Sequence, residues 1–185
     1  MAVISLSVID KNNKPLYVRE FDQTLSADLM SEEQLFGFQS IEQSEEAMNI
    51  DSMCCSPRHQ FVMHAALDKF EQLAGPLPGY GWRNAGINQG MFVGYLCPIE
   101  DLRVYCYVLT TRIKILLVVE DDAVPEMQPS IDNEIKALLT KIHALYIEYL
   151  LSQNFKEIGS VIVSKRFDRL VYQHISDFNQ SEGMI

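Results

Sequence analysis

A run of three strand-like segments occupies Gly90–Glu120 and shows the clearest apolar pattern in the chain. The first, Met91–Cys97, is followed by Pro98, where we expect the strand to end because proline has no backbone N–H to pair. The second, Leu102–Leu109, alternates between two faces, and a link short enough for a hairpin leads to Ile113–Val119. That last segment is apolar on both faces, which predicts a central strand with helices on both sides of the sheet.

Two further strands are predicted at the N-terminus. Ala2–Ile9 alternates between two faces, and Pro15–Phe21 follows after the turn cluster Asp10–Asn13. Since proline interrupts strand pairing, the position of Pro15 favours an edge for the second strand. The two segments therefore predict an N-terminal hairpin.

Three helices are predicted from caps and helical spacing. Ser56 is a suitable N-cap for a helix from Pro57 to about Ala74. A long helix, capped by Ser130 or Asp132, reaches about Leu151. The last helix begins at Ser164, and the tail Asn179–Ile185 is predicted to be loose. Two sets of apolar residues are predicted to be core: Met63, Ala66, Leu67, Phe70 and Leu73 in the first helix, and the aromatic residues Tyr146, Tyr149, Phe167 and Tyr172 in the others.

The predicted order β-β-α-β-β-β-α-α defines an α/β (α+β) fold. We expect a five-stranded, mostly antiparallel sheet with one helix on one face and two on the other. With 185 residues, the chain is long enough to bury a core, and one domain over 1–185 is the natural expectation.

The net charge of −10 is concentrated in one segment. Nine acidic residues and no Lys or Arg lie between Glu20 and Pro57, and the rest of the chain is close to neutral. A segment of this length without clear periodicity predicts a disordered insertion at 22–55, or one with a short helix around Ser31–Phe38. An acidic chain without a basic stripe is a poor binder of nucleic acid and of anionic lipid. No apolar run is long enough to span a membrane and no positive leader opens the chain, so we expect a cytoplasmic protein.

The sequence predicts no metal, no cofactor and no catalytic activity. Cys54 and Cys55 are adjacent and lack a second pair at zinc-ligand spacing, so His59 and His64 do not complete a metal site. Modification of the two cysteines by lipid is an alternative to a plain pair of loop thiols. The glycines in 79–81 follow a helix and lack the Gly-Lys-Ser of a phosphate loop. No serine or cysteine stands with a histidine in a known nucleophile motif.

Several stretches resemble the sedlin family of small subunits of the transport protein particle (TRAPP) complex. Gln60–Asp68 is similar to the family's first-helix motif, and the strand region from Gly94 to Val119 is similar to the sedlin-like subunit. Asp132–Ile135 and Ser164–Val171 continue the resemblance, which covers nearly everything except the acidic insertion and part of the glycine-rich loop.

The resemblance implies a longin fold and a non-enzymatic assembly subunit. TRAPP complexes promote nucleotide exchange on small GTPases of the Rab (Ypt) family and tether vesicles between the endoplasmic reticulum and Golgi. The expected partners are the other TRAPP subunits, both the small core subunits and a large attached one. The expected location is cytoplasmic, at Golgi membranes through the complex and without insertion into the bilayer.

Four residues are candidate partner contacts. The resemblance implies that His64 and Asp68 dock a partner subunit; the alternative for Asp68 is a solvated carboxylate beside Lys69. Trp82 and Arg83 are added because these residue types are enriched at binding hot spots. Another reading of the whole chain is a longin-type regulatory or sorting module of the SNARE class, which would need a coiled-coil segment and an anchor beyond Ile185.

Overall fold

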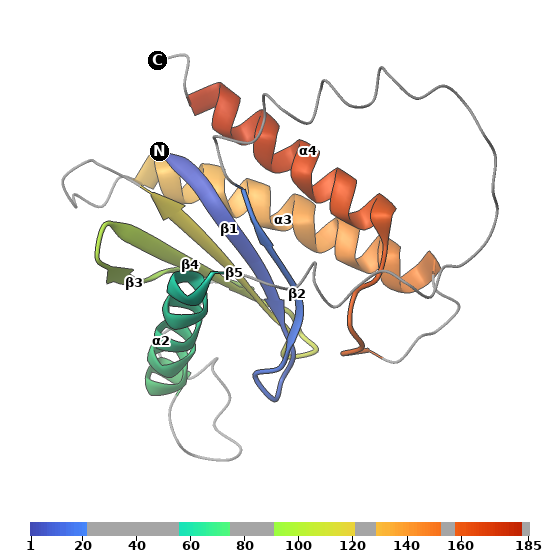
Figure 1. The fold of residues 1–185 in the computed structure, drawn as a ribbon, viewed down its shortest axis with the longest axis horizontal. Coiled ribbons are helices and arrows are strands. Elements are labelled where there is room, and N and C mark those ends of the chain that lie inside the picture. Colours follow the sequence, from blue (N-terminus) through green and yellow to red (C-terminus); the bar gives the residue numbers. More distant parts are fainter. Residues whose placement is uncertain (22–55, 75–90, 121–128, 153–157, 183–185) are drawn as a thin grey trace.

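The computed structural model of the protein shows an antiparallel sheet with helices on both faces (Figure 1). The described residues are 1–21, 56–74, 91–120, 129–152 and 158–182. The strands are β1 (Ala2–Ile9), β2 (Pro15–Glu20), β3 (Phe92–Ile99), β4 (Leu102–Val108) and β5 (Lys114–Glu120). The helices are α2 (Pro57–Ala74), α3 (Pro129–Ser152) and α4 (Lys165–Glu182). The predicted order of elements and the predicted fold class are confirmed.

The five strands lie in the order β2-β1-β5-β4-β3. β5 is therefore the middle strand, as its two apolar faces predict. β2 is an edge strand, which agrees with the position of Pro15 at its start. β5 pairs with β1 on one side and with β4 on the other, which leaves the outer edges of the sheet to β2 and β3.

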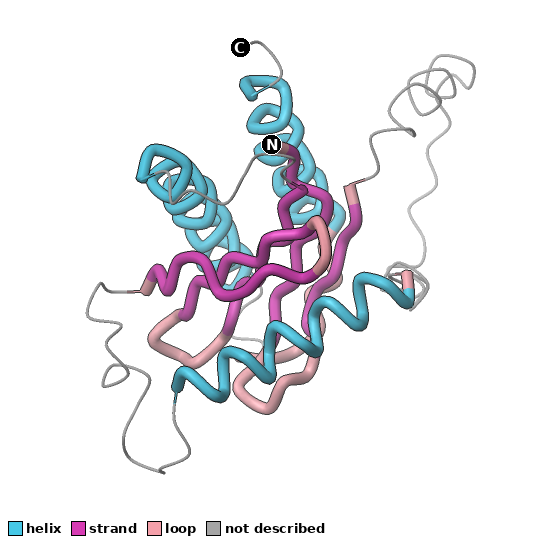
Figure 2. Tube along the Cα trace, turned by 90° about the vertical axis from the view of Figure 1, so that its left-hand side faces the viewer, coloured by secondary structure: helices cyan, strands magenta, loops and turns pink. Residues whose placement is uncertain are grey.

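Two hydrophobic layers hold the sheet between its helices (Figure 2). The first lies between the sheet and the pair α3 and α4, and Ile115, Leu117 and Val119 of β5 belong to it. The second lies under α2 and contains Leu116 and Val118 from the opposite face of the same strand. Because successive side chains of β5 point to opposite faces of the sheet, this one strand contributes residues to both layers.

Pro98 does not end β3, contrary to the prediction. The strand continues to Ile99, with Pro98 opposite Arg103 of β4. Proline is tolerated here because β3 lies at the edge of the sheet. An N–H on the outer side of an edge strand has no neighbouring strand to bond, so its absence costs no hydrogen bond.

The helix ends also differ from the predictions. α3 begins at Pro129, so neither Ser130 nor Asp132 stands before it as a cap; proline suits the first turn because its N–H would have no partner there. α4 continues through Asn179 to Glu182 instead of ending in a loose tail. The Asn179 side chain accepts a hydrogen bond from the Val3 N–H (2.8 Å) and donates one to the Val3 carbonyl (3.0 Å), which ties the end of the helix to β1.

Two predicted core residues lie at the surface. Tyr146, Tyr149 and Phe167 are buried as expected, but Tyr172 is 38% exposed. The Arg19 guanidinium lies 4.9 Å from the centre of the Tyr172 ring, so this ring packs against a cation at the surface. Leu73, in the last turn of α2, is also 38% exposed.

Several predictions concern residues outside the described part of the chain. They are the acidic insertion at 22–55 with its alternative short helix, the thiols Cys54 and Cys55, and the glycine-rich loop that carries Trp82 and Arg83.

A candidate interaction surface on α2

The start of α2 is fixed by a polar cluster at the end of β2. The His59 N–H donates to Ser56 Oγ (3.4 Å), so Ser56 caps the helix as predicted. The Ser56 N–H donates to Glu20 Oε1 (2.5 Å), and the same carboxylate oxygen lies 3.0 Å from His59 Nδ1. The carboxylate of Glu20 thus joins the end of β2 to the first turn of α2.

Two further contacts hold α2 against the sheet. The Arg58 guanidinium contacts Glu100 Oε2 (3.1 Å) and Asp101 Oδ1 (2.6 Å) in the turn between β3 and β4. Near the other end of the helix, Asn13 Nδ2 donates to Glu71 Oε1 (2.5 Å). Exposed ion pairs contribute little to stability, but contacts at both ends fix the direction in which α2 presents its outer face.

A buried lysine packs under the C-terminal part of α2. Lys114 of β5 is 6% exposed, and its ammonium donates to Asn13 Oδ1 (2.7 Å) and to the Asp10 carbonyl (3.3 Å). The ammonium nitrogen lies 5.5 Å from the centre of the Phe70 ring. Burial lowers the pKa of Lys114, while its interactions with Cys106, Glu71 and Asp10 act in the opposite direction.

The outward face of α2 carries Phe61, His64 and Asp68. All three are exposed, and the Phe61 side chain is exposed to 63%. The spacings of three, four and seven residues place them on one face of the helix, opposite the buried Val62, Ala66 and Phe70. Within the part of the chain that the structure describes, Asp68 and His64 form no hydrogen bond or ion pair.

Two of these three residues are the candidate contacts that the sequence predicts on this helix. His64 and Asp68 share a face, as they must if they bind one partner, and their role in docking stays a prediction. Phe61 was missed, although its signal was present: it belongs to the motif Gln60–Asp68 and lies off the apolar stripe of Met63, Ala66 and Phe70. A large aromatic side chain beside an unpaired carboxylate is suited to a protein contact rather than to bond-breaking chemistry.

The remaining described residues offer little for metal or covalent chemistry. No group of three or more His, Cys, Asp and Glu side chains is placed to hold a metal ion in the described ranges. Cys106 is fully buried, and burial raises the pKa of its thiol to about 12, so it is protonated and unreactive at neutral pH. The described helices include none that is both long and apolar enough to cross a membrane.

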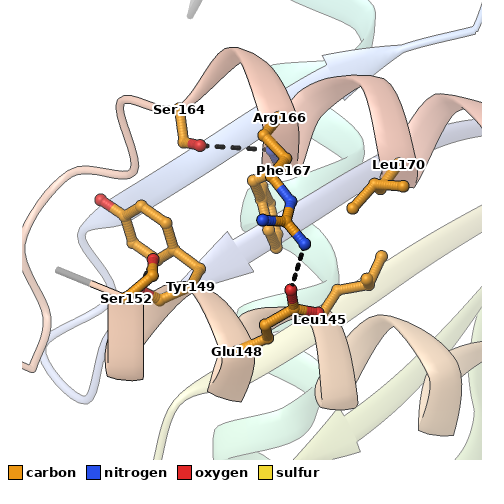
Figure 3. Close-up of a pocket in the computed structure, with 8 residues that line it drawn as sticks. All are labelled: Leu145, Glu148, Tyr149, Ser152, Ser164, Arg166, Phe167 and Leu170. Carbon is orange, nitrogen blue, oxygen red and sulfur yellow. Dashed lines mark hydrogen bonds and ion pairs between the residues drawn. The ribbon is translucent and has the colours of Figure 1, made fainter.

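A cavity between α3 and α4 is too small for an organic ligand (Figure 3). Its volume is about 30 Å³, which is room for about two water molecules at ~15 Å³ each. Arg166 reaches across it to Glu148 Oε1 (2.5 Å), and Ser164 Oγ accepts from the Phe167 N–H (3.2 Å) as the cap of α4. The ion pair between Arg166 and Glu148 joins the two helices.

The fold defines a class of protein: an α+β domain of longin type, with a five-stranded antiparallel sheet and helices on both faces. The sedlin family model matches residues 8–176, nearly the whole chain, and the protein belongs to the sedlin family. A Dictyostelium discoideum protein, trafficking protein particle complex subunit 2-like protein, is 24% identical over 165 residues, which cover 89% of this chain and 90% of the relative. The proteins of that name from Bos taurus and Xenopus tropicalis are 24% and 25% identical over 169 residues, or 91% of this chain and 93% of each relative.

Proposed function

We propose that this protein is a non-catalytic assembly subunit of a TRAPP-type vesicle-tethering complex. Membership of the sedlin family supports the proposal, together with relatives that are named as subunits of that complex and aligned over nearly their whole length. The observation that carries it is the outward face of α2, where Phe61, His64 and Asp68 are exposed on a helix held at both ends.

The proposal includes a partner and a place in the cell. The partners are the other small TRAPP subunits and a large attached subunit, and through them a GTPase of the Rab (Ypt) family whose nucleotide exchange the complex promotes. The protein then acts between the endoplasmic reticulum and Golgi, held at the membrane by the complex. Its own contribution is binding. A helix face docks through a surface of complementary shape, an aromatic side chain that becomes buried in the partner, and a charge.

The test is a substitution on the α2 face. Asp68→Tyr replaces an exposed carboxylate with a bulky ring, so it is expected to reduce the amount of other TRAPP subunits that copurify with the tagged full chain from its native cell at least fivefold. Quantitative mass spectrometry measures the recovery, and circular dichroism is expected to stay native because the side chain lies outside the core.

Glu134→Tyr is the matched control, since Glu134 is an exposed acid on α3, on the other side of the sheet. It is expected to leave the recovery unchanged. Full recovery with Asp68→Tyr would reject the α2 face as the docking site. If no TRAPP subunit copurifies even with the unaltered chain, the proposed function itself is wrong.

A further inference from the structure

Residues 159–164, between α3 and α4, run beside the edge strand β2. The Ile162 N–H donates to the Leu16 carbonyl of β2 (2.9 Å), and the Ile162 side chain is buried in the core between the sheet and the helices. Its neighbours Val161 and Val163 are 36% and 47% exposed. An alternation of exposed, buried and exposed β-branched residues is the pattern of a strand, although one backbone hydrogen bond joins the segment to β2 and the segment is not one of the five strands of the sheet.

Among the described residues, the backbone groups on the outer side of this segment have no partner. Successive residues of an extended chain direct their N–H and C=O groups to opposite sides. Because the N–H of Ile162 is directed at β2, the backbone groups of Val161 and Val163 are directed away from the sheet. None of the backbone hydrogen bonds among the described residues uses either of them.

The opposite edge of the sheet is protected from such pairing, whereas this one is open. β3 has two shifts of register, at Phe92/Gly94 and Tyr95/Cys97, together with a left-handed Gly94 (φ 86°) and Pro98. Bulges and proline are the usual devices that keep an edge strand from pairing with another chain. The stretch 160–163 (Ser-Val-Ile-Val) contains no proline, glycine or charge.

Positive charge follows directly after the open edge. Lys165, Arg166 and Arg169 are exposed on the first two turns of α4. Cations at a helix N-terminus are unfavourable because the helix dipole is positive there. Arg166 is paired with Glu148 of α3, and the one acidic residue in the first turn, Asp168, is paired with Arg19, so neither acid compensates Lys165 or Arg169. In a chain of net charge −10, this corner therefore attracts an acidic partner.

We propose that residues 160–163 are a strand-addition site for an extended, acidic segment of a partner protein. The partner's backbone pairs with Val161 and Val163, and its carboxylates lie near Lys165 and Arg169. A second copy of this chain fits less well, because its own stretch 160–163 carries no acidic side chain to meet Lys165 and Arg169. The site shares no residue with the α2 face, so a subunit docked through α2 can hold an acidic segment of another protein at the same time.

The probe is a short capped peptide of alternating valine and glutamate, titrated into the isotopically labelled full chain and followed by NMR. The amide signals of residues 160–166 are expected to shift and those of α2 to stay in place. The same peptide with alternate residues N-methylated cannot donate to the edge and is expected to bind at least about tenfold more weakly. A valine–lysine peptide is expected not to bind.

A double variant with two reversed charges tests whether the cations of α4 contribute to binding of the acidic peptide. Lys165→Glu with Arg169→Glu is expected to weaken binding of the valine–glutamate peptide at least about tenfold. Lys136→Glu with Lys141→Glu, on the exposed side of α3, changes the net charge equally and is expected to leave binding intact. Asp68→Tyr is also expected to bind the peptide normally, so this proposal can fail independently of the proposed function.

Four results would overturn the inference. They are an absence of shifts at 160–166, equal binding of the N-methylated peptide, a dimer seen by light scattering that uses the same residues, and binding to anionic lipid vesicles that is lost in the charge-reversed pair while the peptide has no effect.

Discussion

At the scale of single residues, burial decides the chemistry of several polar groups. His143 of α3 is partly buried, with its Nδ1 3.2 Å from the Tyr107 hydroxyl of β4 and the two rings 5.5 Å apart. Burial lowers the pKa of His143, because the charged imidazolium loses hydration at the interface between helix and sheet. The pKa of Tyr107 is raised, again mainly by burial, so its hydroxyl is protonated at neutral pH.

The lowered pKa of His143 predicts a loss of stability in mild acid. Below about pH 6.5, where an unfolded histidine takes up its proton, the unfolded chain binds more protons than the folded one. The contribution of His143 is therefore fully present above that pH and is lost as the pH falls toward the lower pKa of the folded state. His143→Gln is expected to reduce the fall in unfolding free energy between neutral and acid pH.

Urea unfolding at a series of pH values measures this effect. Lys141→Gln, an exposed substitution on the same helix, is the control and is expected to keep the slope of the unaltered protein. An identical pH slope in His143→Gln and the unaltered protein would show that this histidine takes no part.

At the scale of elements, caps and side-chain ties fix the ends of the helices. Ser56 and Ser164 cap α2 and α4; the cap at Ser56 was predicted from the sequence, whereas Ser164 was predicted as the start of the last helix and stands one residue before it. The start of α3 and the end of α4 were not predicted correctly, since the first depends on proline geometry and the second on a contact with β1. Asn179 bonds to Val3 across 176 positions of sequence, and no local pattern could indicate this contact.

Asn179→Ala is expected to destabilise the protein by about 1–2 kcal/mol, because it removes two hydrogen bonds and leaves the Val3 backbone without those partners. Amide exchange at Val3 is expected to accelerate. Gln180→Ala is the control, since Gln180 is exposed and bonds only locally to Ser176. Equal unfolding free energies for the two variants would contradict the role given to Asn179.

At the scale of the whole molecule, the residues that form the core lie apart from the exposed residues proposed for partner contact. β5 supplies side chains to both hydrophobic layers, while Phe61 on the outside of α2 supplies none. The core residues of β5 and the proposed contact residues of α2 are therefore different sets, which allows the two roles to be tested separately.

Leu117→Ala and Phe61→Ala are expected to affect different properties. The first lowers stability, and the second lowers copurification of TRAPP subunits. Leu117 is 0% exposed, so its truncation leaves a cavity and costs about 2–5 kcal/mol in urea unfolding. Phe61→Ala is expected to change stability by less than about 0.5 kcal/mol and still to reduce copurification of TRAPP subunits. A strongly destabilised Phe61→Ala would show that the ring supports the fold instead.

The sequence by itself determined the order of elements, the central place of β5 and the helix with His64 and Asp68 on it. These features depend on periodicity and on capping, which are local properties of the chain. The tertiary structure alone decided that Pro98 stays within an edge strand, that Tyr172 lies at the surface beside Arg19, and that α4 extends to meet β1. It also brought residues 159–164 beside β2, more than a hundred positions earlier in the chain. Such outcomes depend on which segments become neighbours in space, and local side-chain patterns do not encode those pairings.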